Sequence, residues 1–124
     1  MNVLVVDDSA VMRTMIVRML RLSGIALDGV FEASNGVEGL DALGKHTVDL
    51  ALVDLNMPVM SGGEMIDRVR ADRRLGGVRL VVVSTDRSPG QEASLRALGA
   101  DFVHKPFTPE VLRSTILRAT GAER

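Results

Sequence analysis

Acidic, hydroxyl and basic side chains occur in this sequence at the points where short apolar runs end. Asp7 and Asp8 follow the first run, and Asp54 follows the third. Ser84 follows the fourth run and Lys105 the fifth. An Asp after a strand is, taken alone, most often a turn former or a helix cap. Only the joint occurrence of these groups at four run ends indicates a chemical site.

The chemistry that these groups could perform together is the binding of a metal ion and of a phosphoryl group. Three carboxylates close together would repel, and one would hold a proton unless a cation neutralised them. Oxygen ligands with positions left open for water and phosphate suit Mg²⁺. Lys105 supplies a point charge suited to a phosphoryl oxygen, and Ser84 can donate a hydrogen bond to it. The residue types therefore predict a Mg²⁺ site that handles a phosphoryl group.

Five apolar runs must position these side chains, and amphipathic stretches separate them. The runs, which we predict to be strands, cover residues 2–6, 28–33, 50–53, 78–83 and 101–104. Three are nearly continuous aliphatic segments, as expected for parallel strands covered on both faces. The alternation predicts an α/β fold of the (βα)5 type with right-handed crossovers and helices on both sides of the sheet. Chemistry in such folds gathers at the carboxyl ends of the strands.

Helix signals stand between the predicted strands. Side chains that can cap a helix precede Glu or Gln by three residues at three places, which resembles a capping box. Thr108 followed by Pro109 predicts the start of the last helix, and Gly24 and Gly99 fall where helices should end. An X-Pro bond after Lys105 is a candidate for the cis form, which would turn the lysine inward. The three capping pairs are Asn35–Glu38, Ser61–Glu64 and Ser88–Gln91.

Length and composition restrict the class of protein. The chain has 124 residues, 46% of them hydrophobic, which predicts one packed domain. A net charge of −1 gives no electrostatic case for nucleic acid or an anionic membrane surface. Cysteine is absent, which excludes disulfides, thiolate metal sites and a thiol nucleophile. The apolar runs are far shorter than the roughly 20 residues that cross a bilayer. We therefore expect a soluble cytoplasmic protein.

Several other features favour structural interpretations. Methionines at the spacing of one helical face are expected to fill the core rather than to form a partner groove. Four arginines after residue 67 are expected to form a solvated helix face that ends in a loop. His46 is expected to be solvated, and His104 to be a packing or surface residue rather than a zinc ligand. The methionines are Met12, Met15 and Met19, and the arginines are Arg68, Arg70, Arg73 and Arg74.

Four short segments, spread along the whole chain, resemble those of one known family. The most specific is DLNMPVMSG at 54–62, which contains Asp54. VVDDS at 5–9 holds the acidic pair, and GAD at 99–101 precedes KPF at 105–107. In this order the segments resemble the response-regulator receiver family, and within it the single-domain CheY-like chemotaxis proteins. The resemblance implies that residues 1–124 form a receiver domain with a flavodoxin-like, doubly wound sheet in strand order 2-1-3-4-5.

The resemblance also implies roles at the acidic site. Asp54 is expected to accept a phosphoryl group from a phosphohistidine on a histidine kinase or a phosphotransfer protein. Asp8 and Asp54 are expected to bind Mg²⁺ through their carboxylates, and Asn56 through its backbone carbonyl. Asp7 is expected to hold a metal-bound water.

The remaining implied roles concern the phosphoryl oxygens and the response to them. Ser84 and Lys105 are expected to contact the phosphoryl oxygens. Phe102 takes the position of the family's aromatic switch residue, which changes rotamer when the hydroxyl at position 84 moves. The expected output partner binds the face formed by the fourth helix, fifth strand and fifth helix. The chain is expected to be a monomer or a weak, phosphorylation-dependent dimer, and a signalling switch rather than an enzyme.

Three alternatives remain beside a stand-alone switch. A small Mg²⁺-dependent phosphohydrolase would carry a second Asp two residues after the first, where this sequence has Ser9. A degenerate receiver would lack Asp54, Lys105 or the acidic pair, and all are present. The chain could also be the receiver of a longer regulator, although the first strand begins soon after Met1.

Overall fold

The computed structural model describes residues 1–85 and 89–121, in which strands and helices alternate. In these residues a single 3-10 turn, η1 (Arg73–Leu75), interrupts the alternation before β4. The strands are β1 (Asn2–Val6), β2 (Gly29–Ala33), β3 (Leu50–Asp54), β4 (Arg79–Ser84) and β5 (Ala100–His104). The helices are α1 (Ala10–Leu22), α2 (Gly36–Lys45), α3 (Gly62–Ala71), α4 (Pro89–Ala97) and α5 (Pro109–Thr120).

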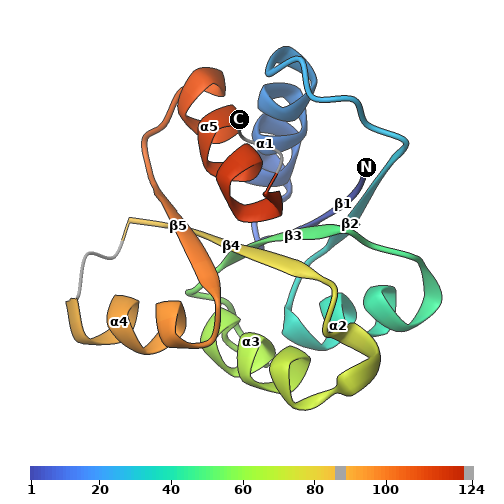
Figure 1. The fold of residues 1–124 in the computed structure, drawn as a ribbon, viewed down its shortest axis with the longest axis vertical. Helices are drawn as coiled ribbons and strands as arrows, with labels where there is room; N and C mark the ends of the chain where they lie inside the picture. Colours follow the sequence, from blue (N-terminus) through green and yellow to red (C-terminus); the bar gives the residue numbers. More distant parts are fainter. Residues whose placement is uncertain (86–88, 122–124) are drawn as a thin grey trace.

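All neighbouring strands of the sheet are parallel, in the order β2-β1-β3-β4-β5. Helices α1 and α5 cover one face, and α2, α3 and α4 cover the other (Figure 1). This confirms the predicted (βα)5 flavodoxin-like fold and its strand order. The predicted bounds were wrong by one residue at several ends. Asp54 and Ser84, for example, are the last residues of β3 and β4 and do not follow them.

The core lies in two layers, one on each face of the sheet. Successive residues of one strand enter different layers, because their side chains point to opposite faces of the sheet. Val3 and Val5 pack with α1 and α5, whereas Leu4 and Val6 pack with α2 and α3. The four side chains are at most 1% exposed. A strand buried on both faces in this way places its carboxyl end rigidly, which matters for the residues that follow it.

Side-chain caps fix where the helices begin. The side chain of Asn35 accepts from the backbone N–H of Glu38 at 2.9 Å, and that of Ser61 from Glu64 at 3.2 Å. Thr108 accepts from Val111 at 3.2 Å, with Pro109 in the first turn of α5. These predicted caps are confirmed, while the cap predicted at Ser88 lies outside the described residues.

The predicted helix ends are confirmed at both glycines. Gly24 follows α1 with φ +82°, and Gly99 follows α4 with φ +86°. Side chains rarely adopt this left-handed region, whereas glycine adopts it without steric cost. The carboxyl terminus of α5 ends in the same way at Gly121, with φ +72°. No helix of the described chain is long and apolar enough to cross a membrane.

Two of the structural interpretations need correction. Met12 and Met19 pack against the core as expected, but Met15 is 47% exposed. It lies beside the face of α1 that carries the buried residues Ile16 and Leu20. Arg70 does not belong to a solvated face. Its Nε donates to the carbonyl of Leu98 at 2.7 Å and its Nη1 to that of Val78 at 3.0 Å, so it joins α3 to neighbouring loops.

Candidate functional site

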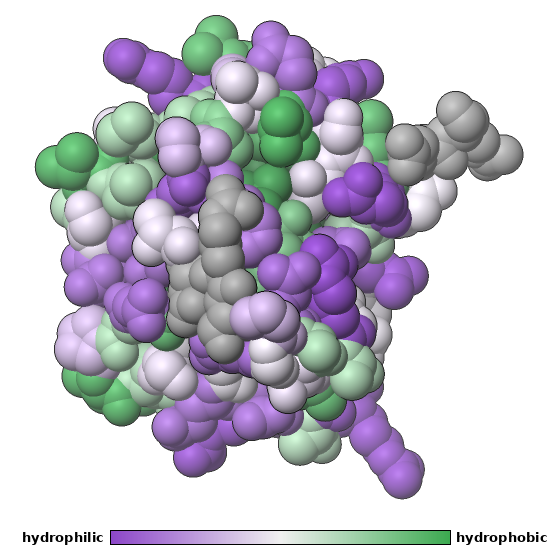
Figure 2. All heavy atoms as spheres, turned by 90° about the vertical axis from the view of Figure 1, so that its left-hand side faces the viewer, coloured by the Kyte–Doolittle hydropathy of each residue, from purple (hydrophilic) through white to green (hydrophobic). Residues whose placement is uncertain are grey.

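Three carboxylates converge at the carboxyl edge of the sheet. Asp7 and Asp8 directly follow β1, and Asp54 ends the neighbouring strand β3. Each can offer one oxygen such that all three oxygens lie within 4.8 Å of one another. Asp7 and Asp54 are buried, whereas Asp8 is exposed, so the cluster opens to solvent on one side. Figure 2 views this edge, where hydrophilic side chains predominate and apolar ones are scattered among them.

Asp7 is held on several sides. Its backbone N–H donates to the carbonyl of Ala33 at 3.1 Å, and its Oδ1 accepts from the N–H of Ser9 at 2.9 Å. Arg13 Nη1 donates to its carbonyl at 2.6 Å, while Nε of the same arginine contacts Glu32 at 3.1 Å. Oδ2 of Asp7 is buried and accepts no hydrogen bond from the described residues. The carboxylate is therefore fixed, with one oxygen left for another ligand.

Sequence reasoning missed the part played by Arg13. The only signal was its place one turn into the helix that begins beside the acidic pair. An arginine there is equally typical of a solvated helix face. Its hydrogen bond to Asp7 goes to a backbone carbonyl, which no sequence pattern marks.

Lys105 supplies positive charge to the cluster. Its Nζ lies 3.5 Å from Oδ2 of Asp7 and 3.8 Å from Oδ1 of Asp54. The lysine follows β5 directly, its N–H donates to the carbonyl of Ser84 at 2.9 Å, and its bond to Pro106 is cis. One ammonium group cannot balance three carboxylates. The surplus negative charge, the oxygen donors and the Oδ2 of Asp7, which accepts no hydrogen bond from the described residues, fit a hard divalent cation.

The ionisation of Asp54 reflects this crowding. Burial, above all, raises the pKa of Asp54, and the charges of Asp7 and Asp8 raise it further. Lys105 and the backbone N–H of Asn56 act in the opposite direction but do not reverse the shift in pKa. A bound cation would favour the ionised form, because it attracts the carboxylate. Asn56 itself is exposed in the loop after β3, and a ligand role for its carbonyl stays a prediction.

Ser84 and Phe102 lie on adjacent strands. Ser84 ends β4, is fully buried and pairs in register with His104, two residues beyond Phe102. Because side chains alternate along a strand, Ser84 and Phe102 belong to the same face of the sheet. The ring of Phe102 is buried, with the guanidinium carbon of Arg96 at 5.1 Å from its centroid. The two candidate switch residues are therefore close in register, and Phe102 is linked to α4 through Arg96.

The two histidines are outside the acidic cluster. His104 points from β5 to α4, where its Nε2 lies 3.2 Å from Oε1 of Glu92. His46 is exposed as expected, and its ring stacks on Phe31 at 4.1 Å. The contact with Glu92 makes His104 a packing residue, as expected.

The loop from β3 to α3 contains a backbone conformation that the sequence did not indicate. Val59 has φ +69° and is 80% exposed. The N–H of Met60 donates to the carbonyl of Pro58 at 2.7 Å, which closes a γ-turn around Val59. A β-branched residue at positive φ is strained, since its side chain crowds the backbone.

Replacing Val59 by Asn should relieve this strain, because Asn tolerates positive φ better than valine does. We expect the free energy of unfolding to rise by about 1 kcal/mol. Urea denaturation followed by circular dichroism measures the change. Val37→Asn is the matched control, since Val37 is an exposed valine inside helix α2, and it should give no gain. Equal effects of the two substitutions would contradict strain at Val59.

Comparison with known proteins finds response regulators by family model, by sequence and by structure. The family model described as "Response regulator receiver domain" matches residues 3–117. A chemotaxis protein CheY homolog of Campylobacter jejuni is 37% identical over 123 residues, which cover 98% of this chain and 93% of that protein. The sensor histidine kinase CheAY of Helicobacter pylori is 34% identical over 128 residues, 98% of this chain but 15% of the kinase. The solved structure of Vibrio cholerae CheY4 superposes with a TM-score of 0.84 at 34% identity, over 95% and 97% of the two chains.

Proposed function

The chain belongs to the response regulator receiver family, and from this premise we propose that it is a phosphorylation switch with Asp54 as the phosphoacceptor. The observation that carries the proposal is the position of the Asp54 carboxylate, which clusters with those of Asp7 and Asp8 within 4.8 Å and lies 3.8 Å from Nζ of Lys105. The donor is a phosphohistidine on a histidine kinase or phosphotransfer protein. We also propose that residues 1–124 form one receiver domain and that the protein acts in the cytoplasm.

The transfer is a displacement at phosphorus. A carboxylate oxygen of Asp54 forms the new O–P bond while the P–N bond of the donor breaks, and the donor imidazole takes the released electron pair. Mg²⁺, when bound, neutralises charge shared by the carboxylate and the phosphoryl oxygens. Asp8, Asp54 and the carbonyl of Asn56 would hold it, and Asp7 would act through a water. Positioning and charge neutralisation supply most of the catalysis in such reactions.

Lys105 and Ser84 bind the phosphoryl oxygens once they are on Asp54. Ser84 then moves toward the new group, and Phe102, on the same face of the sheet, changes its rotamer. Because Arg96 of α4 packs on the ring of Phe102, such a change alters the contacts of α4. The output partner binds the face made by α4, β5 and α5. The shift between two conformations, rather than turnover of a substrate, is the product of the reaction.

The alternatives fit less well. A phosphohydrolase would need a second acidic residue two positions after Asp7, and Ser9 there instead donates its N–H to the Asp7 carboxylate. A receiver that never accepts phosphate would be expected to have lost part of the set of Asp7, Asp8, Asp54 and Lys105, and all are present together at one edge.

Lys105→Ala tests how the switch is coupled. We expect Mg²⁺ affinity to be kept, because the ammonium group is not a ligand and its loss leaves the carboxylates no less attractive to a cation. Beryllofluoride, a phosphoryl analogue, should no longer alter the surroundings of Phe102, since its fluorine atoms lose their contact with Lys105. Amide chemical shifts in ¹⁵N NMR spectra measure this. Lys45→Ala is the control, because Lys45 is exposed and pairs only with Asp41 among the described residues. Wild-type shifts around Phe102 in Lys105→Ala would overturn this role.

A further inference from the structure

A groove lies between α2 and the end of α3, remote from the acidic cluster. Its volume is about 700 Å³, and both helices and η1 line it. It is found where α2 and α3 end and before β3 and β4 begin, which is the opposite edge of the sheet from Asp54 (Figure 1). A ligand in this groove would therefore leave the phosphorylation site free.

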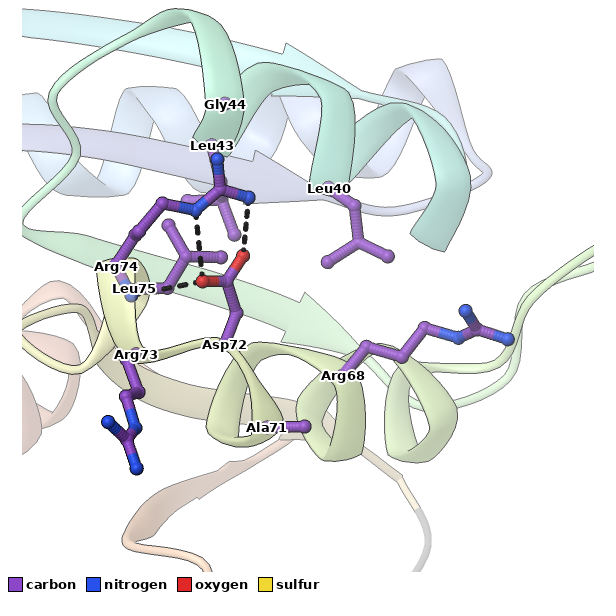
Figure 3. A pocket seen from close by; sticks show the side chains of 9 residues that line it. All are labelled: Leu40, Leu43, Gly44, Arg68, Ala71, Asp72, Arg73, Arg74 and Leu75. Atoms are coloured by element: carbon purple, nitrogen blue, oxygen red, sulfur yellow. Dashed lines mark hydrogen bonds and ion pairs between the residues drawn. The ribbon is translucent and has the colours of Figure 1, made fainter.

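The floor of the groove is apolar. Leu40 and Leu43 extend from α2 and Leu75 from η1 toward the same space (Figure 3). Leu43 is 5% exposed, while Leu40 and Leu75 are half-buried. Gly44 adds no side chain beside them, and nothing lies within 4 Å of a Cβ built on it. The floor can therefore accept one or two large apolar side chains.

Guanidinium groups stand at two ends of this floor. Arg74 at one end binds Asp72 through two contacts, Nε to Oδ1 at 3.2 Å and Nη2 to Oδ2 at 3.0 Å (Figure 3). The hydrogen bonds from Arg74 lower the pKa of Asp72, so the carboxylate stays charged and keeps the arginine in place. The remaining N–H groups of the Arg74 guanidinium have no acceptor within the described residues. At the other end, Arg68 is largely exposed, and among the described residues its one ion pair is a long contact of 3.7 Å with Glu64.

We propose that this groove docks a short acidic segment of a partner protein, with a large apolar side chain placed between carboxylates. Arginine binds carboxylates through paired, charge-assisted hydrogen bonds, and Arg74 is already held in one geometry. The apolar side chain of the segment would cover Leu40, Leu43 and Leu75. Charge at both ends and an apolar middle thus match the same ligand.

Other anionic ligands match the groove less well. A free phosphate ion would leave the leucine floor exposed to water. Single-stranded nucleic acid is held by stacking on aromatic rings, and this floor is aliphatic. A lipid surface could meet Arg68 and Arg74, but a broad surface would not reach Leu43 at the bottom of the groove.

The test selects peptides of about 12 residues from a displayed random library on the full chain. Enriched peptides should be acidic, with a large apolar residue among the carboxylates. The double variant Arg68→Gln, Arg74→Gln should lower their affinity by about tenfold or more, the effect of losing one charge-assisted contact. The matched control is Arg18→Gln, Arg21→Gln on α1, two exposed arginines whose replacement removes the same charge and should change the affinity less than about twofold.

Mapping by NMR completes the test. Binding should shift the amide signals of Leu40, Gly44 and Leu75, and phosphorylation of Asp54 should proceed in the double variant as in the wild type. Enrichment of neutral or basic peptides, equal binding by both double variants, or shifts elsewhere would overturn the proposal. The proposal would also be overturned if no acidic peptide binds, but phosphatidylglycerol vesicles or single-stranded DNA bind and the Arg68 and Arg74 substitutions abolish that binding. Failure of phosphorylation at Asp54 would count against the proposed function alone, because the groove does not depend on it.

Discussion

Asp54→Asn should abolish the binding of beryllofluoride in the presence of Mg²⁺, which the wild type should bind. The substitution keeps the shape of the side chain but removes the carboxylate oxygen that forms the bond to beryllium or phosphorus. It also removes a charged ligand from the cluster of Asp7, Asp8 and Asp54, whose oxygens lie within 4.8 Å of one another. ¹⁹F NMR measures the bound analogue directly. Equal binding of beryllofluoride by the two proteins would contradict the assignment of Asp54 as the phosphoacceptor.

A measurement of the stability of Asp54→Asn tests whether unfolding causes the loss of beryllofluoride binding. Burial raises the pKa of Asp54, so between its ordinary pKa and the raised one the folded state binds more protons than the unfolded state. The free energy of unfolding due to this group therefore falls as the pH rises through that window, and it stays lowered above it. Asn carries no such charge. Without Mg²⁺ at neutral pH, Asp54→Asn should need more urea to unfold than the wild type, whereas the exposed control Asp67→Asn should not.

The sequence predicted most of the fold because its apolar runs are short, aliphatic and regularly spaced. At the carboxyl ends of the strands, the predicted bounds failed where a polar residue is the last one of the strand. Asp54 and Ser84 pair through their backbones with Val83 and His104, and that pairing does not depend on side-chain polarity. The strand order rested on the family resemblance, since alternation alone allows other orders of a parallel sheet.

The acidic site was predictable because parallel strands bring their carboxyl ends to one edge. The contacts of the long arginine side chains were not predictable. Arg13, Arg70 and Arg96 contact, respectively, a carbonyl after β1, carbonyls of two loops, and the ring of Phe102. Such partners come from distant parts of the chain, and an exposed arginine has the same sequence surroundings. The turn at Val59 was hidden for a different reason, because valine is more typical of strands than of positive φ.

Gly62→Ala should be the most damaging single-methyl change near the site. A Cβ built on Gly62 would lie 2.2 Å from the carbonyl oxygen of Asp54 and 2.9 Å from the Cα of Leu55. Both are backbone atoms, so no side chain can turn aside to make room. The N–H of Gly62 also donates to the carbonyl of Leu55 at 3.0 Å, which holds α3 close to the end of β3. The helix or the strand end would have to move.

We expect Gly62→Ala to lower the free energy of unfolding by about 3 kcal/mol, the upper part of the usual range for overpacking. Beryllofluoride affinity should fall as well, because displacement of the Asp54 backbone moves the carboxylate away from Asp8 and Lys105. Urea denaturation and ¹⁹F NMR measure the two effects. Gly63→Ala is a close control, since only Ser61 Oγ, at 4.0 Å, lies near a Cβ built there. Alanine in that helical position should raise stability by about 0.5–1 kcal/mol. If the free energy of unfolding falls for Gly62→Ala and rises for Gly63→Ala, the loss comes from the contact with Asp54. If it falls for both, the loss comes from the helix alone.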